Sequence, residues 1–164
     1  MIDFLKRAAA RDLPEFLYRV FHNGSVSRFD EGSGISSGNP TMFLNTRDDA
    51  YVALKNHLNK NNRTPTPFIS TYSDSRKAKR LADTWQERGE RGVTIVIIDV
   101  EEWRELEWRE LESWRVLEMS RALNYFKFSL PTSVARDATE CEYLVLREIP
   151  PEAIRRVCPA EDFI

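Results

Sequence analysis

Residues 92–100, which read GVTIVIIDV, restrict the possible folds more than any other part of the chain. The run is rich in β-branched residues, which favour strands. Successive side chains of a strand point to opposite faces of a sheet, and apolar residues occupy both alternating sets here. A strand of this kind is typical of the buried interior of a sheet. We therefore predict a strand at the centre of the main sheet.

Alternation and turn residues predict further elements on both sides of this strand. Residues 17–22 and 68–72 are β-rich runs, and a last strand is expected to end near residues 149–151, followed by a short tail. Helical spacing and capping residues predict helices over residues 2–12, 48–59, 76–88 and about 114–125. The Gly- and Ser-rich residues 23–40 and the Pro-bearing residues 128–139 are expected to form loops.

Residues 103–117 contain three imperfect copies of a WRELE unit, a spacing that fits neither a regular helix nor a strand. One interpretation is a charged helix whose tryptophans pack on the domain. The other is a protein-binding surface, because exposed Trp and Arg are common binding hot spots.

Length and composition indicate one globular domain over residues 1–164. Apolar content of 41% and charged content of 30% are ordinary for such a domain. The net charge of −2 gives no electrostatic basis for binding nucleic acid or an anionic membrane. Cys141 and Cys158 are expected to be reduced, and His22 and His57 have no metal-ligand neighbours, so no metal site is predicted.

No apolar run is long enough to cross a bilayer, and the N-terminal residues lack the apolar core of a secretory signal. We therefore expect a cytoplasmic protein, or one exported without a recognisable signal peptide.

Two acidic residues precede the last apolar strand. Glu140 and Glu142 are two positions apart, so both would project from the same face if the strand began before them. Two carboxylates side by side at a partly desolvated site are costly, and such pairs occur often at sites of chemistry. The alternative is a solvated strand end without a chemical role.

Three sets of residues, taken in order, resemble a known family. Arg19 on an early strand, Ser70-Thr71-Tyr72-Ser73 on a middle strand and Glu140-Cys141-Glu142 on a late strand are similar to the Arg, Ser-Thr-Ser and Glu-x-Glu pattern of ADP-ribosyltransferases of the cholera-toxin and heat-labile-enterotoxin type. The segment LYRVFH and the step from Ile149 to Pro150 also resemble that family. Tyr72 departs from the pattern, because it separates Thr71 from the second serine.

The resemblance implies a role for each matching residue. Arg19 would hold the phosphates of NAD, Ser70 would fix the catalytic carboxylate, and Thr71 would support the pocket. Glu142 would bind the nicotinamide ribose and stabilise the positive charge that develops on it, whereas Glu140 would activate an acceptor such as a protein arginine. The implied fold is α+β, with two packed, roughly perpendicular sheets and flanking helices.

The implied function is transfer of ADP-ribose from NAD to an acceptor, expected to be a protein, as in a toxin, an effector or an endogenous regulator. One alternative is an NAD glycohydrolase of the same fold, and another is a non-catalytic domain that binds a partner through residues 103–117. A carbohydrate hydrolase fits less well, since two carboxylates on one strand face do not flank a bond as glycosidases require.

Overall fold

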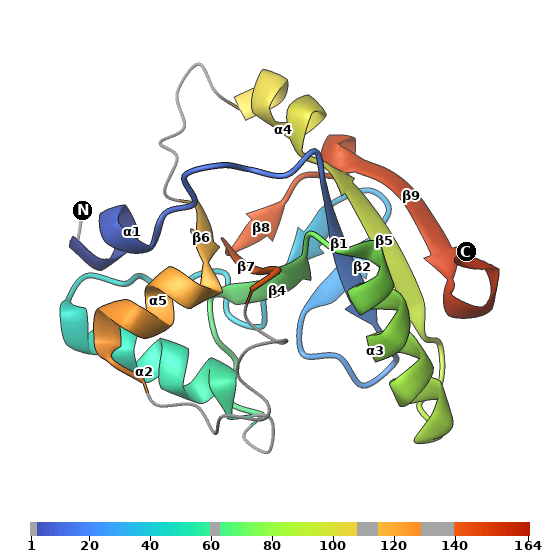
Figure 1. Ribbon diagram of the computed structural model, residues 1–164, viewed down its shortest axis with the longest axis horizontal. Helices are drawn as coiled ribbons and strands as arrows, with labels where there is room; N and C mark the ends of the chain where they lie inside the picture. The colour runs from blue at the N-terminus through green and yellow to red at the C-terminus, as the bar shows by residue number, and fades with distance from the viewer. Residues whose placement is uncertain (1–2, 60–62, 108–114, 129–139) are drawn as a thin grey trace.

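The computed structural model of the chain describes residues 3–59, 63–107, 115–128 and 140–164. Two antiparallel sheets are flanked by helices, so the predicted α+β class is confirmed (Figure 1). The larger sheet has the strand order β6-β7-β4-β1-β5-β9, and these strands span Val116–Glu118, Glu142–Leu146, Phe68–Tyr72, Phe16–Phe21, Thr94–Asp99 and Ile154–Pro159. The smaller sheet has the order β2-β3-β8, with strands Arg28–Asp30, Gly34–Ser36 and Glu148–Ile149.

The helices are α1 (Asp3–Ala8), α2 (Arg47–Leu58), α3 (Ser75–Glu87), α4 (Val100–Glu107) and α5 (Met119–Phe126). Side chains fix where the two longest begin. Thr46 and Asp49 form a capping box at the start of α2, and the Asp74 carboxylate accepts a hydrogen bond from the Arg76 N–H at the start of α3. The helices predicted over 48–59 and 76–88 are confirmed to within one residue at each end.

One face of the six-stranded sheet packs against the three-stranded sheet. Fully buried side chains from both sheets, including Leu17, Val96 and Val145 on one side and Ile35 and Ile149 on the other, form this layer. Each such side chain contributes roughly 1.5–3 kcal/mol through burial. The strand predicted at 92–100 is confirmed as the interior strand β5, but it lies next to the edge strand β9 and not at the centre of the sheet as predicted.

Helices cover the opposite face of the six-stranded sheet (Figure 1). Helices α1, α2 and α5 pack over β6, β7 and β4, where Leu117, Leu144 and Phe68 are buried. Helix α3 packs over β1 and β5, with Ala78 and Ala82 against Val20 and Ile95. Strand β5 therefore has buried side chains on both faces, Val96 and Ile98 on one and Ile95 on the other, in agreement with its apolar sequence.

Three predictions about elements were wrong. The stretch 23–40 is not only a loop, because it contains the β2–β3 hairpin. The residues after 151 are not a short tail, because β9 pairs along β5 as the edge of the large sheet. The helix predicted from about residue 114 begins only at Met119, since residues 116–118 pair with β7 as β6.

Within the described ranges, no helix combines the length and the apolar composition needed to cross a membrane.

Candidate functional site

The three strands that carry the motif residues are neighbours in the large sheet. Strand β4, with Ser70 and Thr71, lies between β7, with Glu142, and β1, with Arg19. Tyr72 is the register partner of both Tyr18 on β1 and Glu142 on β7. The structure therefore brings Arg19, Ser70 and Glu142 into one region from positions more than 120 residues apart in the chain.

Strands β1 and β4 diverge at this region. Among the described residues, their ladder has a single paired position, Tyr18 with Tyr72. Next to this paired position, the Arg19 side chain forms the hydrogen bond to β4. Its Nη1 donates to the Ser70 carbonyl oxygen at 2.9 Å, and its Nη2 donates to the Ser27 hydroxyl at 2.7 Å. A backbone acceptor that the divergence would leave without a partner is thus satisfied by the guanidinium.

The electrostatic surroundings of Arg19 are those of a desolvated cation close to acidic groups. Burial lowers the pKa of Arg19, and the nearby Tyr72 and Glu142 raise it. The guanidinium also lies over the ring of Phe21, 5.0 Å from its centroid. Burial together with Glu142 raises the pKa of the Tyr72 phenol, so Tyr72 stays neutral at physiological pH.

Ser70 is held by a residue that sequence analysis did not include in the site. His57, in the last turn of α2, contacts the Ser70 hydroxyl through Nε2 at 2.7 Å and the Thr66 hydroxyl through Nδ1 at 2.9 Å. Burial and the charge of Arg19 lower the pKa of His57 to about 4. The imidazole is therefore neutral near pH 7 and holds the Ser70 side chain in one rotamer.

His57 lies at helical spacing from the buried Leu54, on the inner side of α2. This spacing was the signal in the sequence that could have placed His57 inside the fold. Its expected lack of metal-ligand neighbours does not conflict with this role, and no group of three or more His, Cys, Asp or Glu in the described residues could hold a metal ion.

Glu140 and Glu142 occupy different environments. Glu142 is the first residue of β7 and is half-buried, on the same sheet face as Ser70. Ser70 and Glu142 are diagonal neighbours across the β4–β7 pair. The backbone positions of such neighbours are about 7–8 Å apart, which a glutamate side chain can span. Glu140 is exposed in the turn before the strand. It therefore does not share the strand face of Glu142, in contrast to the prediction.

Thr71 points to the other face of the sheet. It is fully buried, and its hydroxyl donates to the Tyr143 carbonyl oxygen at 3.1 Å. Thr71 therefore secures β4 to β7 on the face that packs against the small sheet, the face to which Arg19 and its register partner Val96 also belong.

Two buried polar side-chain atoms have no hydrogen-bond partner in the part of the chain that the structure describes. They are Arg19 Nε and the Ser37 hydroxyl. Ser37 directly follows β3 and Ser27 directly precedes β2, next to the paired Ser36 and Arg28. Buried unpaired polar groups are rare in stable folds and call for a partner. An anionic group such as a phosphate would supply an acceptor to either donor.

Only the first tryptophan of the repeated segment lies within the described residues. Trp103, in α4, is buried in the layer between the two sheets and does not form a binding surface. Trp108 and Trp114 lie outside the described residues. The same holds for most of the loop predicted over 128–139.

The fold and the site define an α+β protein of two antiparallel sheets, with a buried arginine, a histidine-held serine and a glutamate on three adjacent strands. The chain belongs to the family described as Domain of unknown function (DUF7587), whose model matches residues 12–163. No curated protein matches the sequence.

Proposed function

We propose that this protein is an NAD-dependent mono-ADP-ribosyltransferase. The observation that carries the proposal is the sheet order β7-β4-β1, which groups Glu142, Ser70 and Arg19. These three residues are among those that carry the sequence resemblance to the enterotoxin-type enzymes. The second, smaller sheet packed on the first agrees with the two-sheet fold of that family.

The reaction breaks the bond between nicotinamide and ribose and joins that ribose carbon to an acceptor. Positive charge develops on the ribose as the bond breaks, and a fixed carboxylate beside it is a strong source of catalysis. Glu142 is the carboxylate in position for this task, since it is half-buried and electrostatically coupled to Arg19. Nicotinamide leaves with the bonding electron pair, and the acceptor loses a proton to a base or to solvent.

Arg19 would bind the phosphates through Nε and through the donors that now contact Ser70 and Ser27. His57 and Ser70 form a relay of hydrogen bonds that orients whatever the Ser70 hydroxyl contacts. His57 is neutral near pH 7, because burial and the charge of Arg19 lower its pKa to about 4.

A second candidate is an NAD glycohydrolase, in which water is the acceptor. The exposed position of Glu140, in a turn rather than on the strand face of Glu142, favours it. An acceptor-activating base is expected beside the reacting ribose, and hydrolysis needs only Glu142. Transfer remains the main proposal because a turn residue at the strand end can reach a large acceptor that docks from outside.

The deciding experiment incubates the purified chain with NAD that is labelled in the adenylate half. Label that leaves as free ADP-ribose indicates hydrolysis, and label that stays on protein indicates transfer. We expect Glu142→Gln to reduce both by about 10²–10³-fold, since it removes the carboxylate that stabilises the ribose cation. Glu140→Gln is expected to abolish transfer and to leave slow hydrolysis.

Glu148→Gln is the matched control, because Glu148 is exposed on β8 and undergoes the same change of charge. It should behave as the wild type in both assays. If Glu142→Gln turned over NAD as fast as this control, or if the wild type produced neither free labelled ADP-ribose nor labelled protein, the proposed chemistry would be wrong.

A further inference from the structure

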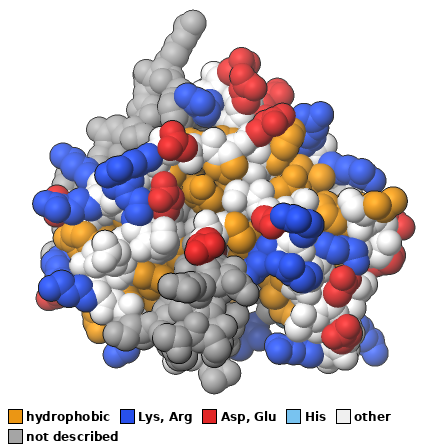
Figure 2. Space-filling model, in the orientation of Figure 1, with side chains coloured by type: hydrophobic (Ala, Val, Ile, Leu, Met, Phe, Trp, Pro, Cys, Tyr) orange, Lys and Arg blue, Asp and Glu red, His pale blue; other side chains and the backbone are white. Residues whose placement is uncertain are grey.

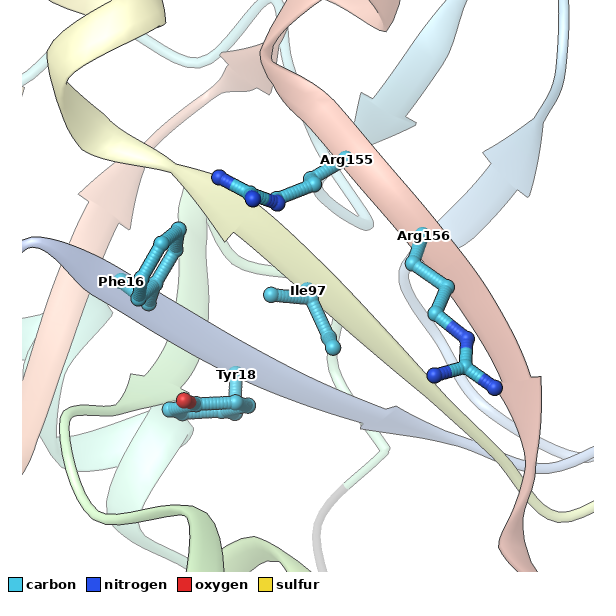
Figure 3. A pocket seen from close by; sticks show the side chains of 5 residues that line it. All are labelled: Phe16, Tyr18, Ile97, Arg155 and Arg156. Atoms are coloured by element: carbon cyan, nitrogen blue, oxygen red, sulfur yellow. The ribbon is translucent and has the colours of Figure 1, made fainter. Parts of the chain in front are cut away.

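A pocket of about 360 Å³ lies on the large sheet away from the Arg19 guanidinium. It is lined by Phe16 and Tyr18 of β1, Ile97 of β5, and Arg155 and Arg156 of β9. Figure 3 shows the two arginine side chains on the β9 side and the two rings on the β1 side, with Ile97 between them. Its volume lies at the lower end of the range for small-molecule sites.

A register shift in the sheet places both arginines at this pocket. Adjacent residues of a regular strand point to opposite faces. Here Ile97 pairs with Arg156, but Ile98 pairs with Ile154, so Arg155 is left over as an extra residue. Irregularities of this kind redirect side chains and are common beside functional sites.

Arg155 is fixed in place by two neighbours. Its Nη1 lies 3.1 Å from the Asp99 Oδ2 atom, and its guanidinium lies over the ring of Phe16 at 5.1 Å from the centroid. Arg156 is exposed and forms no ion pair within the described residues. The pocket thus has one positioned guanidinium and one whose charge is not neutralised.

Edge strands often carry arginine or lysine only to prevent pairing with other chains. Arg155 is 60% exposed, as such a side chain would be, but it also contacts Asp99 and Phe16, and Ile97 and Tyr18 form an apolar floor beside it.

We propose that this pocket binds a small aromatic anion, a planar ring system of one or two rings that bears a phosphate or carboxylate group. The ring would lie on Phe16, Tyr18 and Ile97, where apolar area is removed from water. The acidic group would meet Arg156, whose planar fork suits both phosphate and carboxylate oxygens. This site is additional to the proposed NAD chemistry and does not depend on it.

The pocket shares a sheet face with Glu142. Register partners run in one row from Glu142 through Tyr72, Tyr18 and Ile97 to Arg156. Four strand spacings of about 4.8 Å separate the ends of this row by about 19 Å. A ligand of one or two rings at Arg156 therefore leaves Glu142 free.

The test titrates the full chain with four probes: 1-naphthyl phosphate, 1-naphthoate, 1-naphthol and inorganic phosphate. Calorimetry gives the dissociation constants, and amide chemical shifts map the bound position. Both naphthyl anions should bind at least about tenfold more tightly than naphthol or phosphate, because only they use both the rings and a charged hydrogen bond. The tighter of the two anions identifies the preferred acidic group.

Arg156→Gln should weaken 1-naphthyl phosphate at least about tenfold, since it removes the charged hydrogen bonds. Arg156→Lys keeps the charge but loses the planar guanidinium. Its affinity for 1-naphthyl phosphate should lie between those of Arg156→Gln and the wild type. Arg91→Gln, the same change at an exposed turn before β5, should have no effect. Arg19→Lys should also leave the affinity unchanged, which separates this pocket from the proposed NAD site.

Equal weakening by Arg91→Gln and Arg156→Gln would mean nonspecific charge attraction and would overturn the proposal. It would also be overturned if no probe saturated, or if the shifts mapped around Arg19 instead of Tyr18 and Ile97.

Discussion

At the scale of single residues, the candidate site depends on groups that are kept in one charge state by their surroundings. Arg19 is desolvated yet satisfied by the Ser70 carbonyl and the Ser27 hydroxyl. His57 is desolvated beside that cation, which disfavours a second positive charge. The two residues therefore constrain each other, and each can be tested by a change that alters chemistry more than shape.

The first prediction concerns the pH dependence that His57 imposes on stability. Its folded pKa of about 4 lies below the usual value of 6.5, so the unfolded chain binds more protons between these pH values. Stability should therefore fall as the pH drops from about 6.5 to about 4, by up to about 3 kcal/mol from this residue alone. Urea unfolding at half-unit pH steps measures the slope.

His57→Gln is the informative variant, because its amide can still hydrogen-bond to Ser70 but does not titrate. The slope between pH 4 and 6.5 should be shallower than in the wild type, whatever the variant's stability at pH 7. Equal slopes in the two proteins would mean that His57 ionises normally and is not desolvated by the fold.

Arg19→Lys is expected to lower both stability and NAD affinity. A lysine keeps the charge but cannot donate to the Ser70 carbonyl and the Ser27 hydroxyl together. Loss of one charged hydrogen bond to a buried acceptor costs about 1–3 kcal/mol, and the melting temperature should fall accordingly. Ser27→Ala, which removes only the second acceptor, serves as a comparison for the purely structural part.

Measuring both NAD affinity and melting temperature in Arg19→Lys and Ser27→Ala separates the effect on binding from the effect on folding. If Arg19→Lys melted earlier but bound NAD as the wild type does, the arginine would be a structural link between β1 and β4 and would not be a ligand contact.

At the scale of elements, α2 presents His57 to the site and is anchored at its other end by its cap. Thr46 accepts from the Asp49 N–H at 3.1 Å, and the Asp49 carboxylate accepts from the Thr46 N–H at 2.9 Å. The Thr46 hydroxyl, and then the Thr46 N–H, lower the pKa of the Asp49 carboxyl, so the hydrogen bonds to this carboxylate contribute to stability at neutral pH and are lost in acid.

Thr46→Ala should therefore destabilise the protein by about 1 kcal/mol at pH 7, while Thr46→Ser should be nearly neutral. Chemical denaturation of the three proteins measures this. The difference between Thr46→Ala and wild type should shrink below the pKa of Asp49, because the Thr46 hydroxyl then no longer stabilises a charged carboxylate. A constant difference across pH would argue against the interaction of the Thr46 hydroxyl with the Asp49 carboxylate.

Elements with strong local signals could be predicted from the sequence, and those decided by tertiary pairing could not. Strand β5 and helices α2 and α3 follow from apolar periodicity and caps. The β2–β3 hairpin was missed because each strand has only three residues within a Gly- and Ser-rich stretch. Strand β9 follows two prolines and was taken for a tail, yet its pairing with β5 gives the sheet its edge.

The site shows the same division. Arg19, Ser70 and Glu142 could be placed on strands from their neighbours, but their adjacency depends on the strand order, which no local pattern encodes. Glu140 was expected on the strand face of Glu142, and the chain turns before β7 begins instead. His57 was outside the predicted site because its partners, Thr66 and Ser70, reach it only after α2 packs on β4.

At the scale of the whole molecule, the candidate site depends on the two sheets staying together. Ser27 and Ser37 flank the β2–β3 hairpin of the small sheet, whereas Arg19 belongs to the large one. The view in Figure 2 shows Lys and Arg side chains interspersed with Asp and Glu over the visible face, in keeping with the net charge of −2. Packing between the sheets, and not long-range charge, is then expected to hold the site.

Ile35→Ala tests whether the two sheets unfold as one unit. Ile35 lies on β3, is fully buried in the layer between the sheets, and pairs with Ile149. Removing its side chain should lower the free energy of unfolding by about 2–5 kcal/mol, because a cavity replaces buried apolar contacts. The exposed Val52→Ala on α2 is the control and should change stability by less than about 0.5 kcal/mol. Tryptophan fluorescence and far-ultraviolet circular dichroism should report the same single transition in both variants, since Trp103 belongs to the layer that contains Ile35. Two separate transitions in Ile35→Ala would show that the small sheet can detach while the large sheet stays folded, and the chain would then not be a single cooperative domain.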